Sequence, residues 1–122
     1  MNLLCLLFLL NAALIPRVHF DSNSFSIPSE EKIILNQNVV WLKENPKEVI
    51  ILEGHCDEWG DAFYNMELGD RRAREVKAYL MEEGVDPERI IMIVSYGSKR
   101  PLDLRHENEA WKLNRRVEFV MR

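Results

Sequence analysis

Residues 53–58 place a histidine, a cysteine and several carboxylates directly after an apolar run, a position where functional sites are commonly built. A hydrolytic mechanism would use His55 with Asp57, or Cys56 as a nucleophile activated by His55. Adjacent side chains of an extended strand point to opposite faces, so we expect Cys56 and His55 to diverge rather than exchange a proton. We therefore interpret His55 as a residue that holds the turn in place by hydrogen bonds, and we expect that the protein is not an enzyme.

A second segment, residues 69–74, brings three arginines to the first half of a helical pattern. Arg71 and Arg72 face different directions on a helix, so only one of them can serve a given site. Either could offer a planar fork for a carboxylate, near a helix start that also favours anions. If the loop of Asp57 folds over this helix start, the pocket would suit a zwitterion. The alternative is a salt bridge between Asp57 and one of the arginines.

The remaining candidate ligands give no metal site. His19, His55 and His106 lack the spacing that places two ligands on one helical face. The two cysteines, Cys5 and Cys56, fit neither a disulfide framework nor a zinc motif. We therefore expect neither a metal nor a cofactor.

Length and composition predict a single soluble domain. The chain has 122 residues, of which 47% are apolar and 30% charged, which is enough for a core and too apolar for a disordered chain. Its net charge of −4 provides no basic excess for phosphate backbones, so we expect no nucleic-acid partner.

Residues 1–16 differ from the rest of the chain. The run at 3–15 holds thirteen residues with only Asn11 polar, too short for the ~20 residues of a membrane-spanning helix. Its length favours an export signal, although no positively charged leader precedes it. A buried N-terminal segment or a misassigned start stays as the alternative. Acylation of Cys5 is less favoured, because no small residue stands before it.

The elements that position these side chains follow from the hydrophobic pattern of residues 17–122. Alternating or β-branched runs predict strands at 17–21, 49–52, 90–96 and 117–120. Helical spacing predicts helices from Ser29, as N-cap, to Asn45, from about 64 to 83 before Gly84, and a short one at 109–113. The order βαβαβ(α)β predicts an α+β two-layer sandwich, with helices on one face of a four-stranded mixed sheet.

Four ordered motifs closely resemble the OmpA-like C-terminal domain, and most nearly its peptidoglycan-associated lipoproteins. They are EGHCDEWG at 53–60, YNMELGDRRA at 64–73, VSYGSKRP at 94–101 and NRRVE at 114–118. The resemblance extends over residues 17–122. It departs from the family at Cys56, where threonine or alanine is usual, and at Trp59, where arginine is common. The lipid-bearing cysteine and linker usual in those lipoproteins are missing, so the mode of membrane attachment stays open.

The resemblance implies non-covalent binding of the peptidoglycan stem peptide through meso-diaminopimelate. In that family the aspartate matching Asp57 takes the ammonium group of the ligand, and the arginine matching Arg72 takes its carboxylate. The other matching pocket residues are Phe20, Asp21, Asn65 and Leu68. Arg115 and Arg116 match a motif that we interpret as mostly structural.

The resemblance also implies a place in the cell envelope. It predicts a domain on the periplasmic side of the outer membrane that anchors this membrane to the wall and acts in cell division. The implied partners are peptidoglycan, TolB and other Tol proteins. One alternative is a protein-binding module of the envelope that does not bind the wall, and a less favoured one is a cell-wall hydrolase. A flagellar-stator type protein would need a full membrane-spanning helix with an intramembrane acid, which the sequence does not offer.

Overall fold

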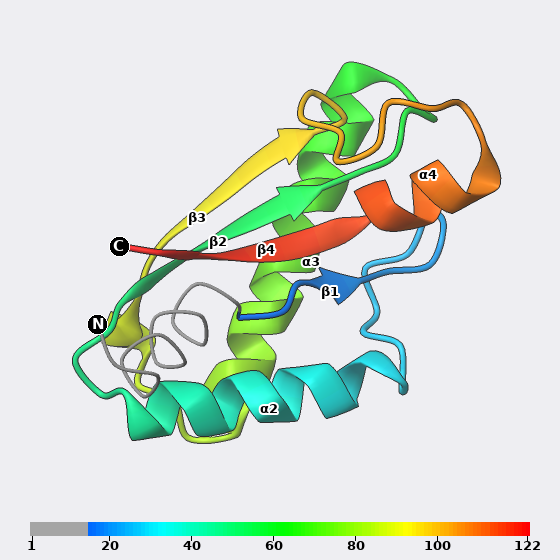
Figure 1. Ribbon diagram of the computed structural model, residues 1–122. Helices are drawn as coiled ribbons and strands as arrows, with labels where there is room; N and C mark the ends of the chain where they lie inside the picture. The colour runs from blue at the N-terminus through cyan, green and yellow to red at the C-terminus, as the bar shows by residue number, and fades with distance from the viewer. Residues whose placement is uncertain (1–14) are drawn as a thin grey trace, which may run out of the picture.

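The computed structural model describes residues 15–122. The predictions for an export signal and for Cys5 therefore lie outside the described residues. Figure 1 shows the order of the elements, which are β1 (Val18–His19), α2 (Glu31–Glu44), β2 (Ile50–His55), α3 (Ala62–Glu82), the 3₁₀ turn η1 (Pro87–Arg89), β3 (Ile90–Gly97), α4 (Asn108–Asn114) and β4 (Arg116–Met121).

The four strands form one mixed sheet in the order β1-β4-β2-β3. Strand β2 pairs in parallel with β3 and antiparallel with β4, and β4 pairs antiparallel with β1. The apolar run at 49–52 predicted a central strand, and β2 is central. The predicted α+β class with a four-stranded mixed sheet is confirmed.

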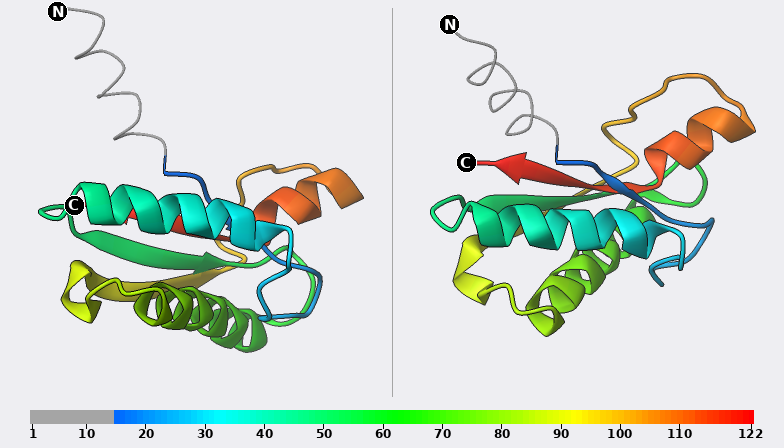
Figure 2. Two further views of the ribbon diagram at one scale, coloured as in Figure 1. Left: turned by 90° about the horizontal axis from the view of Figure 1, so that it is seen from below. Right: turned by 60° about the horizontal axis from the view of Figure 1, so that its bottom comes forward.

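Side chains from both long helices enter one core against the same face of the sheet. Leu35, Leu42, Val76 and Leu80 are fully buried together with Leu52 of β2. Burial alternates along the first four residues of β2, because successive strand residues point to opposite faces. Helices α2 and α3 therefore cover one face, whereas α4 and the loop before it lie at one end of the sheet (Figure 2).

Three boundaries differ from the predictions. Strand β1 contains only two residues, Val18 and His19, which pair with β4. The next amide, that of Phe20, donates at 2.9 Å to the carbonyl oxygen of Arg115, which precedes β4. Helix α2 starts after Glu30 without a side-chain cap, so the prediction of Ser29 as N-cap is wrong. Strand β2 extends to His55, beyond the predicted end at 52, because pairing with both β3 and β4 continues through His55.

Helix α3 lies unusually close to the sheet where Gly69 meets Gly54. A Cβ atom added to Gly54 would lie 1.7 Å from the Gly69 carbonyl oxygen, and one added to Gly69 would lie 2.3 Å from Ser95 Oγ. Only glycine allows this approach. The contact fixes the first half of α3 against the end of β2, where the candidate site is located.

Within residues 15–122, no helix is both long and apolar enough to cross a bilayer.

Candidate functional site

A pocket of about 190 Å³ opens between the C-terminal end of β2, the start of α3 and the loop after β1. It brings together four of the predicted site residues, Asp57, Asn65, Leu68 and Arg72. The rest of its lining consists of Ser22, Asn23, Cys56, Trp59, Gly60 and Tyr64. The loop of Asp57 thus does fold over the start of α3.

Asp57 is 7% exposed, and two contacts hold its carboxylate at the pocket. Its Oδ1 accepts a hydrogen bond from the Trp59 amide at 3.0 Å. Its Oδ2 pairs with Arg115 Nη1 at 3.3 Å. The ion pair with Arg115 compensates the buried carboxylate, and the carboxylate still lines the pocket.

Arg72 is 1% exposed, and its side chain is fixed by the backbone rather than by an acid. Its guanidinium donates to the carbonyl oxygens of Ser24 (2.8 Å), His55 (3.0 Å) and Asp21 (3.0 Å). A guanidinium has five N–H donors, so two remain for a ligand. No carboxylate of the described residues lies within ion-pair distance of it. Burial lowers the pKa of Arg72, because desolvation disfavours its charged form.

The structure distinguishes the two neighbouring arginines. Arg71 is exposed, and its guanidinium lies 5.4 Å from the centre of the Phe25 ring. The salt bridge considered as an alternative, between Asp57 and one of these arginines, is not formed, because Asp57 pairs with Arg115. Asp57, Arg72 and Arg115 together carry one excess positive charge.

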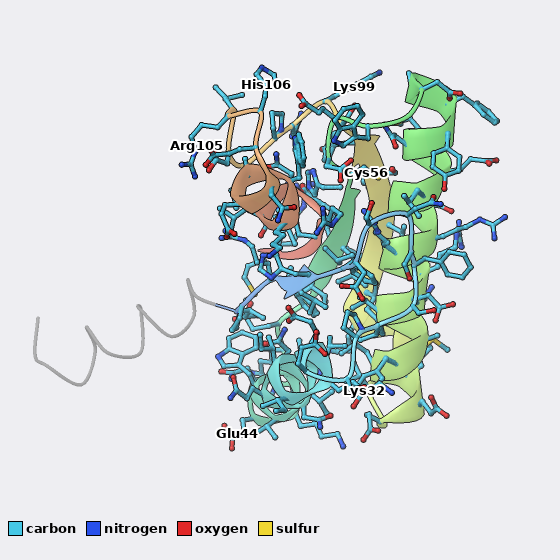
Figure 3. All side chains as sticks on the ribbon, turned by 90° about the vertical axis from the view of Figure 1, so that its right-hand side faces the viewer. Lys32, Glu44, Cys56, Lys99, Arg105 and His106 are labelled. Atoms are coloured by element: carbon cyan, nitrogen blue, oxygen red, sulfur yellow. The ribbon has the colours of Figure 1, made fainter. Side chains whose placement is uncertain are left out.

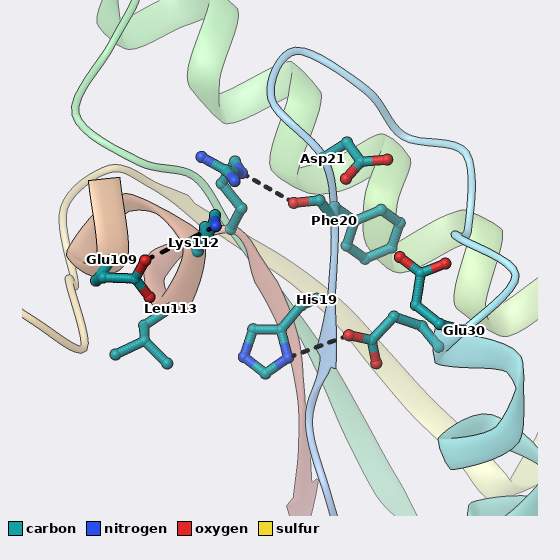
Figure 4. Close-up of a pocket in the computed structure, with 9 residues that line it drawn as sticks. His19, Phe20, Asp21, Glu30, Glu109, Lys112 and Leu113 are labelled. Carbon is teal, nitrogen blue, oxygen red and sulfur yellow. Dashed lines mark hydrogen bonds and ion pairs between the residues drawn. The ribbon is translucent and has the colours of Figure 1, made fainter. Parts of the chain in front are cut away.

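Phe20 and Asp21 contribute to this pocket through their carbonyl groups, and the centre of the Phe20 ring also lies 5.3 Å from the Arg72 guanidinium. The Phe20 carbonyl accepts from Arg115 Nε at 2.8 Å, and the Asp21 carbonyl accepts from Arg72 Nη2. Their side chains line a neighbouring cavity of about 430 Å³ with His19 and Glu30 (Figure 4). The two residues therefore orient Arg72, which lines the smaller pocket, and Arg115, which lines the neighbouring cavity; Phe20 and Asp21 do not line the smaller pocket themselves.

Arg115 is the residue that sequence reasoning did not assign to the site. It was interpreted as mostly structural, whereas its guanidinium bridges Phe20 O and the Asp57 carboxylate. No local signal in the sequence could have found it, because Arg115 and Asp57 are 58 residues apart and meet only in the folded chain. Arg116 fits the structural interpretation, since it bonds Asn114 O, Arg100 O and Glu118.

His55 and Cys56 do not form a catalytic pair. The His55 ring stacks on Tyr96 at 5.5 Å, and its Nε2 lies 3.3 Å from Glu53. The Cys56 thiol donates to Asn65 O at 3.2 Å. Burial raises the pKa of Cys56 to about 11, so this thiol stays protonated at neutral pH. The predicted divergence of the two side chains is confirmed.

The three histidines do not form a shared metal site, because each one lies beside a different glutamate. His19 pairs with Glu31 at 3.5 Å and His106 with Glu58 at the opposite side of α4. In Figure 3 Cys56 lies inside, next to the sheet, and His106 at the outer edge. Among residues 15–122 no group of three or more His, Cys, Asp or Glu side chains could hold a metal ion.

Comparisons with known proteins agree with this fold and these motifs. The OmpA family matches residues 19–115. The peptidoglycan-associated lipoprotein of Pseudomonas aeruginosa is 41% identical over 101 residues, which are 83% of this chain and 59% of that protein. The peptidoglycan-associated lipoprotein of Rhizobium meliloti is 36% identical over 105 residues, 86% of this chain and 59% of that protein.

Solved structures with a similar fold include another peptidoglycan-associated lipoprotein. The peptidoglycan-associated lipoprotein of Burkholderia pseudomallei superposes with a TM-score of 0.80 at 34% identity, covering 87% of this chain and 89% of that one. The C-terminal domain of Helicobacter pylori MotB also reaches 0.80, at 25% identity, covering 88% and 84%.

The chain belongs to the OmpA family. Within this family, the relatives described above at 36–41% identity are peptidoglycan-associated lipoproteins. The chain spans about three fifths of the length of these curated relatives.

Proposed function

We propose that this domain binds the stem peptide of peptidoglycan non-covalently, through the zwitterionic end of a meso-diaminopimelate residue. The Asp57 carboxylate receives the ammonium group, and the Arg72 guanidinium receives the carboxylate. Asn65 and Leu68 form the helix-side wall around the carbon chain. Phe20 and Asp21 hold Arg115 and Arg72 in place through their carbonyl groups, and the Phe20 ring also lies against Arg72.

One observation carries this proposal. Arg72 is a buried guanidinium without a carboxylate partner among the described residues, and it lines the same small pocket as Asp57. A buried charge is costly when it is unpaired. A ligand carboxylate would supply the missing partner, and the two unused N–H donors allow a charge-assisted contact. An ammonium group beside Asp57 would complete the match.

The role of this binding follows from the family and is part of the proposal. A domain of this kind, placed on the periplasmic side of the outer membrane, holds that membrane to the wall without catalysis. Partnership with TolB and other Tol proteins, and a role in cell division, are further expectations from the relatives. The alternative is a protein-binding role without wall binding, and the experiment must distinguish it from binding of the stem peptide.

Co-sedimentation of the full chain with insoluble peptidoglycan of the diaminopimelate type tests the proposal. We expect the parent chain to pellet with the wall, and Asp57→Asn to stay in solution, since it removes the charge but keeps the shape. Arg71→Ala is the matched control, because Arg71 neighbours Arg72 but is exposed away from the pocket. Circular dichroism must show that each variant is folded. A soluble parent, or an Asp57→Asn variant that still pellets, would refute wall binding by this pocket.

A further inference from the structure

Trp59 is a large aromatic side chain left in solvent at the rim of the pocket. Its exposed fraction is 61%, although it lines the same cavity as Asp57 and Arg72. Leaving a ring of this size in water forgoes roughly 2 kcal/mol of burial. Exposed apolar surface beside a pocket is characteristic of a binding surface.

The ring is held in position by its neighbours. The Trp59 amide donates to Asp57 Oδ1, and Gly60 follows with a φ of +91°, which turns the chain sharply. The ring meets Trp111 edge to face, with centroids 5.3 Å apart at 74°. Trp111 is itself fixed, because its Nε1–H donates to Glu58 Oε1 at 3.0 Å. A ligand that stacks on Trp59 would therefore lose little free energy to ordering this side chain, because its neighbours already hold it.

Polar groups flank this ring. Tyr64, 44% exposed, lines the same pocket, and its hydroxyl has no hydrogen-bond partner among residues 15–122. The Asn65 amide makes only a long contact of 3.5 Å to Gly60 O. An aromatic face beside unused donors and acceptors fits a pyranose ring, which presents apolar C–H groups on one face and hydroxyl or amide groups at its edge.

The rim surface is a small one. Phe63, which is 73% exposed, lines a separate hollow with Met66 and Arg71. The aromatic surface at the pocket is thus formed by Trp59 and Tyr64, with polar groups around them. A protein hot spot is instead a dry centre surrounded by contacts that exclude water. These observations favour a sugar over a protein at this position.

We propose that Trp59, supported by Trp111, is a stacking platform for an N-acetylated amino sugar of the glycan strand. The inference rests on the proposed function, because the stem peptide in the pocket is covalently joined to such a sugar. A stem peptide bound between Asp57 and Arg72 lies in the pocket whose rim includes Trp59, so the sugar joined to it is held near this ring. The covalent link keeps the sugar at high effective concentration there, so even a weak stacking contact adds to the affinity.

The test compares two soluble ligands by titration calorimetry with the full chain. One is the free stem tripeptide that ends in meso-diaminopimelate, and the other is the same tripeptide carrying its disaccharide. We expect the parent to bind the disaccharide form about tenfold more tightly, which corresponds to about 1.4 kcal/mol. Trp59→Ala should abolish this difference, so that the variant binds the two ligands with equal affinity. Phe63→Ala, the matched exposed aromatic, should retain it.

Two results would overturn the platform. One is equal affinity of the parent for both ligands, and the other is an equal loss of both ligands in Trp59→Ala, which would place Trp59 against the peptide instead. Failure of the proposed function gives a different pattern, since the parent would then not bind the tripeptide at all. If Trp59→Ala changes capture of a purified envelope protein but neither titration, the surface binds protein and the sugar proposal is wrong.

Discussion

Arg72 has a structural role in addition to the binding role proposed for it. Its guanidinium connects the loop after β1 to the end of β2 through the carbonyls of Asp21, Ser24 and His55. The same group lines the pocket beside Asp57. Loss of binding in an Arg72 variant therefore has to be separated from loss of folding.

We predict that Arg72→Ala lowers the free energy of unfolding by roughly 3 kcal/mol or more, because it leaves three carbonyls of the segment without their donors. Arg71→Ala should change it by at most about 0.5 kcal/mol, since Arg71 is exposed. Urea unfolding followed by circular dichroism measures both values. Similar losses in the two variants would contradict the assigned role of Arg72.

His55 makes stability depend on pH. Burial lowers its pKa to about 4, and the charge of Arg116 adds to this effect. The unfolded chain keeps an ordinary histidine pKa near 6.5. Between these two values the unfolded state binds a proton that the folded state does not. The free energy of unfolding therefore falls as pH decreases from about 6.5 to about 4, and the His55 contribution is constant above this window.

We predict that His55→Gln flattens this fall, with at most about 1.4 kcal/mol per pH unit removed. Urea unfolding of the parent and the variant at several pH values gives the difference. The neighbouring Glu53 acts in the opposite direction, because burial raises its pKa, but it remains in both chains. Parallel pH profiles for parent and variant would show that His55 does not titrate as described.

At the scale of elements, the contact between α3 and β2 sets the distance between the two halves of the site. Asp57 follows β2 three residues after Gly54, and Arg72 lies in α3 three residues after Gly69, so the Gly54–Gly69 contact is close to both. Gly54→Ala would place a Cβ atom 1.7 Å from the Gly69 carbonyl oxygen. Backbone must move to relieve this overlap, since no flexible side chain is involved.

We predict that Gly54→Ala destabilises the domain by about 1–3 kcal/mol or more and weakens binding of the stem peptide. Thermal unfolding and the tripeptide titration measure the two effects. Glu67→Ala, on the exposed side of the same helix, serves as the control and should leave both unchanged. A Gly54→Ala variant with parental stability would mean that α3 and β2 are not held this closely.

Local patterns predicted most of these elements. Strand β2 was readable from its continuous apolar run, and the end of α3 from Gly84, whose φ of +95° fits a C-terminal cap. The predicted N-cap at Ser29 was wrong. The helix α2 begins after Glu30, and the turn before it is closed by backbone hydrogen bonds such as that from Lys32 N to Ser29 O. The short β1 was over-extended for a similar reason: tertiary contacts, not alternation, decide where pairing ends.

The pocket itself was only partly predictable. The spacing of Asp57 and the two arginines suggested a zwitterion site, but the choice of Arg72 depends on which side of α3 faces the sheet. The partner of Asp57 lies 58 residues away, at Arg115. Long-range pairings of this kind arise from the topology, in which β4 lies beside both β1 and β2. No local pattern records them.

At the scale of the whole molecule, the proposed function requires that Arg72 receives one carboxylate of the ligand. Stem peptides that end in meso-diaminopimelate and in L-lysine differ by that carboxylate, so their comparison isolates it. The other charges and the carbon chain are shared by the two ligands. Titration of the full chain with each peptide is therefore the most direct measurement.

We predict that the diaminopimelate peptide binds and that the lysine peptide binds at least about tenfold more weakly, since a charge-assisted contact contributes about 1.5–3 kcal/mol. Asp57→Asn should weaken both, because both carry the ammonium group. Equal affinity of the parent chain for the two peptides would contradict the assignment of Arg72 as the carboxylate receptor.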